Sequence, residues 1–282
     1  MTTALLIDTD TGIDDAAALW WACLSPDVEL VGITTVFGNV DLDDAVANAC
    51  RVLELAGTTD VPVTLGATGP FGPAPELRRA DFIHGEDGVA DTGRRPVRAA
   101  PTAESSVDLL TRLVHERPGE IVVVTIGPMT NVAHVITADP GWAPLVKRLV
   151  VMGGAVSAPG NALPAAEANI AHDPLAAAVC LGAAWAVPPL IVGLDVTQAA
   201  TLTLADIDLA REGRTAAGAD LADLLAFYQP FGGTFCEPGE FPCHDALAVM
   251  AAVIPGLVTG PVLPTAVQSD PGPALGMTVF DR

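Results

Sequence analysis

Short apolar runs alternate along the chain with segments in which apolar residues recur every three or four positions. The runs predict buried strands, and the helical spacing predicts helices that cover them. The predicted strands span residues 4–7, 30–36, 61–65, 121–126, 149–152 and 190–194. The predicted helices span residues 13–24, 43–56, 105–115, 129–138, 173–184, 205–211, 218–231 and 244–253. This alternation predicts an α/β fold with a mainly parallel central sheet flanked by helices, an open, Rossmann-like arrangement.

Residues 66–98 show neither pattern. They are rich in Gly, Pro and polar residues and predict a long loop. No linker divides the predicted core, so residues 1–282 are expected to form a single domain. Residues 175–194 and 246–268 carry no charge and are long enough to cross a bilayer, but prolines interrupt both stretches. A helix, a turn and a buried strand explain each of them better, and we expect no transmembrane span.

The charge balance excludes one large class of partners. The chain has 34 acidic residues against 13 basic ones, for a formal net charge of −21. Such a surface repels the phosphates of DNA and RNA, so we expect no nucleic acid polymer as a partner. The five cysteines show no CxxC spacing, and the N-terminus has no basic, signal-like region. A reducing, cytoplasmic location is therefore expected.

A dense group of carboxylates follows the first predicted strand. Asp8, Asp10, Asp14 and Asp15 lie close together at the end of this strand and the start of the next helix. Like charges at such short spacing repel one another unless a cation or protons neutralise them. A solvated turn would leave this repulsion beside an apolar strand. The pattern therefore favours a site for a hard metal ion.

Two other motifs share part of this pattern. An EF-hand loop needs Gly at its sixth position and Glu at its twelfth. Counted from Asp8, the chain has Ile13 and Leu19 there, which excludes an EF-hand. A phosphatase of the haloacid dehalogenase type also begins with an apolar strand and an Asp-x-Asp pair, and it remains an alternative. That class needs a later phosphate-binding lysine, whereas the chain's only lysine, Lys147, precedes a strand.

Polar residues also follow the later predicted strands. Asn39 follows the second strand, and His84 lies in the loop after the third. A Gly-Pro turn after Ile126 leaves the carbonyl of that residue free of ladder bonding. Further polar residues lie beyond the fifth strand and at the start of the last helix: Asn161, Glu167, Asn169, His244 and Asp245. Because ligands of parallel sheets bind beyond the carboxyl ends of the strands, these residues are expected to share one site.

The motif Asp-x-Asp-x-Gly-x-Asp-Asp after the first strand, with the later motifs in the same order, resembles the inosine–uridine-preferring nucleoside hydrolase family. The resemblance runs from residue 5 to residue 282. It implies Ca²⁺-dependent hydrolysis of the N-glycosidic bond of a ribonucleoside, which yields ribose and the free base. It also implies that a small-molecule nucleoside is the substrate and that the chain forms a homodimer or homotetramer.

The resemblance further implies a role for each motif residue. The carboxylates of Asp10, Asp15 and Asp245 and the carbonyl of Ile126 would bind Ca²⁺. Asp10 would also act as the general base. His244 would protonate the leaving base, with His84 as its helper. The residues implied to bind the substrate are Asp14, Asn39, Met152, Asn161, Glu167, Asn169 and Asp245.

The chain departs from the family pattern at four positions. Ala168 stands where the family usually has an aromatic residue, which thins the pocket wall near the 5′ end of the sugar. His172 is also unusual and could partly refill this wall. Gln268 and Leu275 replace the Glu and Arg of a C-terminal family segment. The affinity and the substrate preference are expected to differ as a result.

The resemblance does not identify the base of the substrate, but two histidines indicate which bases are accepted. His84 and His244 are both present, whereas strictly purine-preferring members tend to replace the second. This favours the broader or pyrimidine-tolerant branch. A protein that binds a nucleoside without turnover, or that acts on another ribosyl compound, remains an alternative.

Overall fold

The computed structural model describes residues 2–77, 80–232 and 236–281, and a six-stranded sheet runs through it. The strands are β1 (Thr3–Thr9), β2 (Val28–Thr35), β3 (Val63–Leu65), β4 (Ile121–Thr125), β5 (Arg148–Met152) and β6 (Leu190–Val192). Every neighbouring pair in the order β3-β2-β1-β4-β5-β6 is parallel. This is the strand order of doubly wound sheets, and it confirms the predicted α/β fold class.

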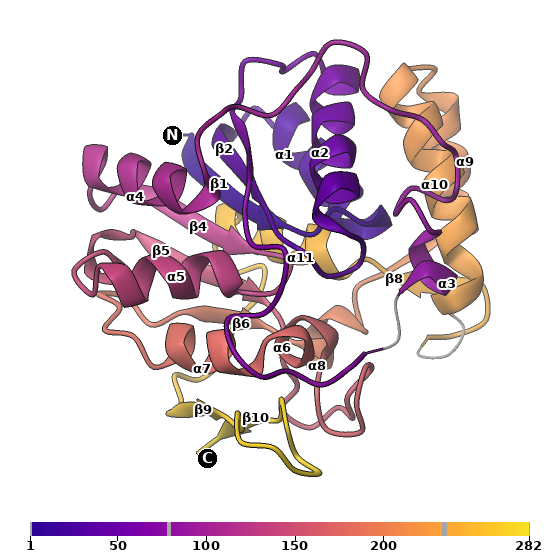
Figure 1. Ribbon diagram of the computed structural model, residues 1–282. Helices are drawn as coiled ribbons and strands as arrows, with labels where there is room; N and C mark the ends of the chain where they lie inside the picture. The colour runs from indigo at the N-terminus through magenta and orange to yellow at the C-terminus, as the bar shows by residue number, and fades with distance from the viewer. Residues whose placement is uncertain (1, 78–79, 233–235, 282) are drawn as a thin grey trace.

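Helices alternate with the strands and cover the sheet (Figure 1). Before β5 these are α1 (Ile13–Leu24), α2 (Leu42–Ala56), α3 (Asp81–His84), α4 (Ser106–Glu116), α5 (Thr130–Ala138) and the short 3₁₀ helix η1 (Ala143–Leu145). After β5 they are α6 (Ala168–His172), α7 (Pro174–Leu181), α8 (Leu194–Thr197), α9 (Leu204–Glu212), α10 (Ala216–Gly232) and α11 (His244–Val253). The described residues also form two antiparallel strand pairs: β7 (Thr201–Thr203) with β8 (Glu240–Pro242), and β9 (Thr265–Val267) with β10 (Thr278–Phe280).

The side chains of β1 alternate between two apolar cores. Leu5 and Ile7 pack with residues of α1, α2, α10 and α11, whereas Ala4 and Leu6 pack with residues of α4, α5 and α7. The sheet is thus covered on both faces, with α1 on one and α5 on the other. This explains why its strands read in the sequence as unbroken apolar runs and not as alternating ones.

Two strands, β3 and β6, are shorter than predicted by two residues each. β3 begins at Val63, because Pro62 has no N–H to donate to the ladder. β6 ends at Val192, and the chain turns at Gly193 into α8. The pairs β7–β8 and β9–β10 are not predicted at all, because strands of three residues are too short to show an alternating pattern.

Side-chain caps start short helices that the periodicity does not reveal. The Glu167 carboxylate accepts hydrogen bonds from the N–H groups of Asn169 and Ile170 at 3.0 and 3.1 Å and starts α6 inside a predicted loop. Asp173 accepts from the Ala176 N–H at 3.0 Å, so the helix predicted over 173–184 begins at the next residue. The long loop predicted over 66–98 contains α3, which has no side-chain cap. These helices matter because α3 and α6 carry candidate site residues.

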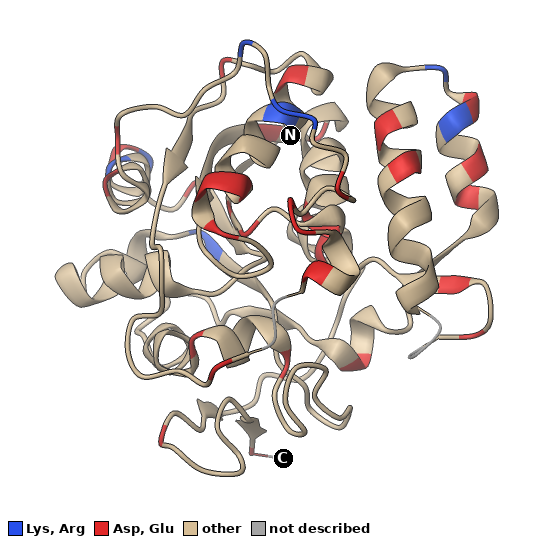
Figure 2. Cartoon of the chain, turned by 45° about the vertical axis from the view of Figure 1, so that its right-hand side comes forward, with Lys and Arg blue, Asp and Glu red and all other residues tan. Residues whose placement is uncertain are grey.

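The molecule carries an excess of acidic side chains. Figure 2 shows Asp and Glu on many elements, including both α9 and α10, and much less Lys and Arg. Exposed arginines pair with some of these carboxylates, for example Arg117 with Glu29 at 2.7 Å. Across residues 2–77, 80–232 and 236–281, no helix combines the length and the apolar character needed to cross a membrane.

An ion pair fixes α10 against α2. Asp220 of α10 is 4% exposed at its side chain and pairs with Arg51 of α2 and with Arg94 of the long segment before α4. Arg51 is itself only 10% exposed at its side chain. Three segments that are distant in the sequence therefore meet at one carboxylate, and α10 is held in place by it.

Removing this carboxylate is expected to destabilise the fold. Asp220→Ala leaves Arg51 charged and nearly buried without a partner, and the free energy of unfolding should fall by about 3 kcal/mol in urea denaturation. Asp223→Ala is the matched control, because Asp223 is half exposed and contacts Arg94 at 3.3 Å. That variant should change the free energy by less than about 0.5 kcal/mol. Equal urea midpoints for the two variants would show that the buried pair does not anchor α10.

Candidate active site

A cavity opens where the strand order of the sheet reverses. β1 leads into α1 on one face and the neighbouring β4 leads into α5 on the other, which leaves a crevice beyond their carboxyl ends. The cavity has a volume of about 360 Å³. The predicted site residues that line it are Asp14, Asn39, His84, Ile126, Met152, Asn161, Glu167, Asn169, His244 and Asp245. The structure thus brings together residues from most of the length of the chain.

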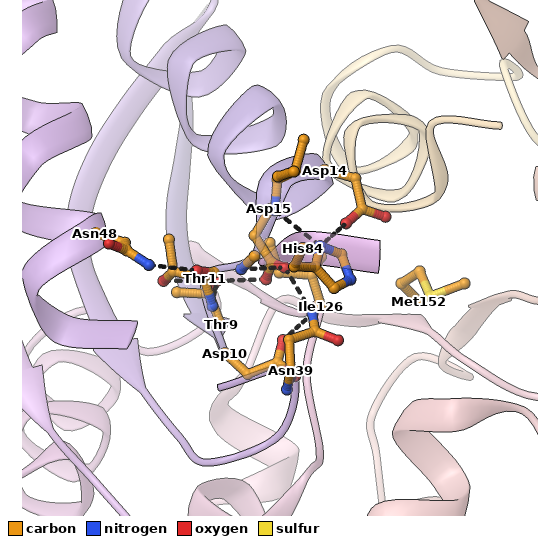
Figure 3. A network of polar contacts seen from close by, with 12 residues as sticks. Thr9, Asp10, Thr11, Asp14, Asp15, Asn39, Asn48, His84, Ile126 and Met152 are labelled. Atoms are coloured by element: carbon orange, nitrogen blue, oxygen red, sulfur yellow. Dashed lines mark hydrogen bonds and ion pairs between the residues drawn. The ribbon is translucent and has the colours of Figure 1, made fainter. Parts of the chain in front are cut away.

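Asn39 joins two fully buried carboxylates behind this lining (Figure 3). Its backbone N–H donates to Asp10 Oδ2 at 2.7 Å. Its Nδ2 donates to Asp10 Oδ1 at 3.2 Å and to Asp15 Oδ2 at 3.1 Å. Asp15 also accepts from the Thr9 hydroxyl at 2.6 Å and from the Gly12 N–H at 2.9 Å. Burial, followed by repulsion from Asp15, raises the pKa of Asp10 well above its ordinary value.

Asp14, Asp15 and Asp245 form a compact acidic cluster. Each offers one carboxylate oxygen, and these oxygens lie within 4.8 Å of one another. Burial, followed by repulsion from Asp15, raises the pKa of Asp14 to about 7, and burial and the neighbouring aspartates raise that of Asp245 well above its usual range. Within the described residues, Asp14 Oδ1 has no hydrogen-bond partner. Crowded oxygens that lack a positive charge, one of them unused, fit a divalent cation.

Asp8 supports the sheet beside this cluster and does not line the cavity. Its Oδ1 accepts from the Thr34 hydroxyl at 2.6 Å and from Asn131 Nδ2 at 2.7 Å. These contacts link β1 to β2 and α5. The hydrogen bonds of Asp8 therefore fasten β1 to its neighbours in the fold.

Asn169 and Glu167 are held by backbone groups near the ends of β4 and β5. Asn169 Nδ2 donates to the carbonyls of Ile126 at 3.0 Å and Met152 at 3.1 Å. Glu167 accepts from the Gly154 N–H at 3.1 Å, in addition to capping α6. Burial raises the pKa of Glu167 to about 7. One lone pair of the Ile126 carbonyl is thus already in use, and a second remains for a ligand.

Two histidines also line the cavity, His84 buried and His244 half-buried. His84 Nδ1 accepts from the Ile13 N–H at 3.1 Å, so the neutral ring carries its proton on Nε2. Gly12 permits this approach, because a Cβ there would lie 2.7 Å from His84 Nδ1. Burial and the neighbouring His244 lower the pKa of His84 to about 3, and burial lowers that of His244 to about 4. Both imidazoles are therefore neutral at pH 7.

Aromatic side chains form an apolar wall that the sequence pattern does not reveal. The Tyr228 ring lies 5.8 Å from the His84 ring, centroid to centroid, and Phe82 meets Phe231 edge to face at 6.1 Å. All three aromatic residues line the cavity and suit a flat, unsaturated ring. An aromatic residue in an apolar helix gives the same pattern whether it faces a core or a cavity. The one distinguishing signal is that Tyr228 is the chain's single tyrosine.

Comparison with known proteins decides the family. A sequence profile of the inosine-uridine preferring nucleoside hydrolases matches residues 5–282. The chain belongs to this family. Uridine nucleosidase 1 of Arabidopsis thaliana is 37% identical over 281 residues, which covers 99% of this nucleoside hydrolase and 82% of the relative. The inosine-uridine preferring nucleoside hydrolase of Leishmania major is 35% identical over 285 residues, covering 100% of this chain and 88% of the relative.

Solved structures agree with this assignment. A plant nucleoside hydrolase superposes with a TM-score of 0.91 at 36% identity, covering 100% of this chain and 87% of that one. A purine-preferring ribonucleoside hydrolase from Gardnerella vaginalis also has a TM-score of 0.91, at 35% identity, with 99% and 88% of the two chains covered. The predicted resemblance is confirmed, and the chain is an N-ribosyl hydrolase. The phosphatase alternative is not supported.

Proposed function

We propose that this enzyme hydrolyses the N-glycosidic bond of ribonucleosides to ribose and free base, with a divalent cation that we assign as Ca²⁺. The observation that carries the proposal is the meeting of the three clustered carboxylates with two neutral histidines at one cavity of about 360 Å³. The carboxylates suit a divalent cation and the diol of a sugar. The histidines, together with the aromatic wall, suit a nucleobase. A volume of this order fits one small ligand.

The groups assigned to hold Ca²⁺ are the carboxylates of Asp10, Asp15 and Asp245 and the carbonyl of Ile126. The set consists of oxygen ligands alone, which this ion prefers. When bound, the ion offsets the charge of the cluster and makes a nearby water more acidic. Asp14 brings a further oxygen into the same cluster, and its unused Oδ1 is free to accept a hydrogen bond from the 2′-hydroxyl.

Asp10 is assigned as the general base. Its two oxygens are held by Asn39, so the carboxylate is oriented before the substrate arrives. The water that loses its proton to Asp10 attacks the anomeric carbon opposite the base, which inverts the configuration at that carbon.

Glu167 is assigned to stabilise the positive charge that builds on the ribose ring. Only the ionised carboxylate can do this, and burial places its pKa at about 7. We expect kcat/KM for uridine to fall tenfold per pH unit below this value, in a profile measured with Ca²⁺ present. The clustered aspartates stay ionised when Ca²⁺ is bound, so we assign this fall in kcat/KM at low pH to the protonation of Glu167. If Glu167→Gln shows the same fall in kcat/KM at low pH, another group is responsible for it.

His244 is assigned to the departing base, with His84 beside it. The Thr197 hydroxyl lies 2.7 Å from His244 Nδ1 and can donate to it, which leaves the proton on Nε2. Because the pKa of His244 is lowered to about 4, the neutral ring first donates a hydrogen bond to the base as negative charge builds there. The proton that the free base finally carries is then taken up from solvent.

A His244→Ala variant should separate leaving-group assistance from binding. We expect kcat for uridine to fall about 10²-fold, because the departing base loses its donor. With p-nitrophenyl β-D-ribofuranoside, whose leaving group needs no proton, the rate should stay within about threefold of wild type. Equal losses with both substrates, measured by absorbance, would contradict this role.

Pyrimidine ribonucleosides are the proposed preferred substrates. The relatives named uridine nucleosidase and pyrimidine-specific ribonucleoside hydrolase, the latter from Salmonella at 34% identity, support this choice. The purine-preferring relative of known structure supports a broader range. A second candidate is another ribosyl compound, which Ala168 and His172 favour because they alter one wall of the cavity.

The proposal is tested with uridine, cytidine, inosine and adenosine in separate incubations with Ca²⁺. We expect free base and ribose in equal amounts, fastest from uridine or cytidine, by chromatography and a reducing-sugar assay. Uridine 5′-monophosphate serves as a control and should release no inorganic phosphate. Release of ribose from none of the four nucleosides would refute the proposed substrate class.

Two further assignments go with the proposal. A cytoplasmic location is supported by the five cysteines, all of which are free thiols. A homodimer or homotetramer is proposed from the family resemblance, and sedimentation equilibrium measures it directly.

A further inference from the structure

Among the described residues, three histidines line the cavity, and the group that faces Nδ1 of each ring determines where its proton lies. His84 Nδ1 accepts from the Ile13 N–H at 3.1 Å, so the neutral ring carries its proton on Nε2. His172 Nδ1 lies 2.7 Å from the Ala168 carbonyl, which only accepts, so this ring carries its proton on Nδ1. Both partners are backbone groups with a fixed role. The partner of His244 is of a different kind.

The Nδ1 atom of His244 faces a side-chain hydroxyl. Thr197 Oγ1 lies 2.7 Å from it, and a hydroxyl can either donate or accept. Thr197 is fully buried, and within the described residues its Oγ1 has no other hydrogen-bond partner. A buried O–H that donates to nothing is costly, because it has given up its hydrogen bonds to water. The hydroxyl therefore donates to Nδ1, and the proton of the neutral His244 ring lies on Nε2.

The fold holds these two side chains together, although 47 positions separate them in the sequence. Thr197 is the last residue of α8, and His244 is the first residue of α11. Between them, β7 and β8 pair in antiparallel fashion, with Thr201 opposite Pro242. This pairing brings the start of α11 to the end of α8, and the two helices contact each other. Both ends of the hydrogen bond are thus set by the fold, before a substrate arrives.

We propose that Thr197 is the positioning residue that keeps the Nε2–H of His244 directed at the departing base. The inference rests on the proposed function, because His244 is the group assigned to that base. Thr197 is not among the described residues that line the cavity, whereas His244 is, so Nδ1 points away from the ligand and Nε2 faces it. A carbonyl in place of the hydroxyl would reverse the arrangement, as Ala168 does for His172, and would leave Nε2 without a proton.

Thr197→Val tests this role, because valine has the shape of threonine but no hydroxyl. The kcat for uridine should fall about tenfold, which is the scale of one neutral hydrogen bond, and KM should stay within about threefold of wild type. With p-nitrophenyl β-D-ribofuranoside, whose leaving group needs no proton, the rate should stay within about threefold. Thr197→Ser keeps the hydroxyl and should keep more than about half of the wild-type kcat. Thr111→Val, which removes a hydroxyl that donates to the Val107 carbonyl in α4, is the control and should match wild type.

A double-mutant cycle separates positioning from a structural role. Because Thr197 acts through His244, Thr197→Val should change kcat for uridine by less than about twofold when it is introduced into His244→Ala. An equal loss in both backgrounds would show that the hydroxyl supports the fold and not the imidazole. That outcome, or equal losses with both substrates in Thr197→Val, overturns the inference.

The position of the proton can also be measured without turnover. The chain has five histidines, and ¹⁵N NMR of their rings distinguishes a nitrogen that carries a proton from one that does not. The spectrum of His244→Ala identifies the His244 signals. At neutral pH with Ca²⁺ present, we expect the proton on Nε2 in wild type and a mixture of both tautomers in Thr197→Val.

A proton on His244 Nδ1 in the wild type, or an unchanged tautomer in Thr197→Val, overturns the inference. The same spectra separate it from the proposed function. If no nucleoside is cleaved but the tautomer of His244 depends on Thr197 as expected, the proposed function fails and the positioning of His244 by Thr197 stands.

Discussion

Asp10→Asn is expected to lower kcat for uridine by about 10²–10⁴-fold, which is the usual contribution of a positioned general base. The asparagine keeps the size of the side chain and one acceptor for Asn39, but it cannot take a proton from water. KM should change much less, because Asp10 lies behind the cavity lining and contacts Asn39 and not the ligand surface. Steady-state kinetics with Ca²⁺ at saturation measures both quantities.

Asp8→Asn is the matched control for this variant. Asp8 lies two residues earlier in the chain, on β1, is equally buried, and accepts its hydrogen bonds from Thr34 and Asn131 outside the cavity. The kcat of Asp8→Asn should stay within about threefold of wild type, because the substitution alters hydrogen bonds of β1 and not a group that takes part in the reaction. If Asp10→Asn keeps more than about a tenth of the wild-type kcat, or if the two variants lose equally, Asp10 is not the base.

Removal of the divalent cation is expected to abolish activity reversibly. After exhaustive chelation, kcat/KM for uridine should fall by at least about 10²-fold, and Ca²⁺ should restore it. Ca²⁺ should also raise the melting temperature of the chelated protein, because an ion that binds only the folded state adds about 2.7 kcal/mol at a hundredfold excess over its Kd. Most of this stabilisation should arise at the acidic cluster, because its aspartates repel one another when no cation is bound.

Asp245→Asn tests whether this cluster binds the ion. Loss of one charged ligand should raise the Ca²⁺ concentration for half-maximal activity by about tenfold or more and reduce the thermal shift. Asp8→Asn is again the control and should keep the wild-type Ca²⁺ response, because Asp8 is bound to Thr34 and Asn131. Full activity in the chelated wild type, or an unchanged Ca²⁺ response in Asp245→Asn, would contradict the metal assignment.

The part of the site that lies close together in the sequence could be predicted from it. Asp10 lies between β1 and α1, Asp14 and Asp15 lie in the first turn of α1, and any parallel sheet places such a junction at its carboxyl edge. Ile126, directly after β4, follows by the same rule, whereas Asp245 lies at the start of α11, after the antiparallel strand β8, and does not. Their meeting with the first strand depends on the strand order, which the periodicity of the sequence does not specify.

Other features depend on contacts that exist only in three dimensions. Asn39 binds two carboxylates at once because β2 lies next to β1, whereas the sequence offers only an asparagine at a strand end. Tyr228 reaches the cavity because Asp220 fixes α10 against α2, a contact between segments that are distant in the sequence. The helix α6 begins because the Glu167 side chain caps it, which no apolar period signals. Side chains that act through distant partners are therefore the ones that sequence patterns miss.

Hydrolysis of uridine followed by ¹H NMR from the first turnovers onward tests the central claim most directly. The sample contains the wild-type enzyme with Ca²⁺, and the signals of the sugar and of the base are integrated together. We expect uracil and ribose in equal amounts, with α-ribofuranose, the inverted anomer, formed first. Absence of free ribose, a phosphorylated sugar as the product, or initial formation of the β anomer would contradict attack by water on the anomeric carbon at this site.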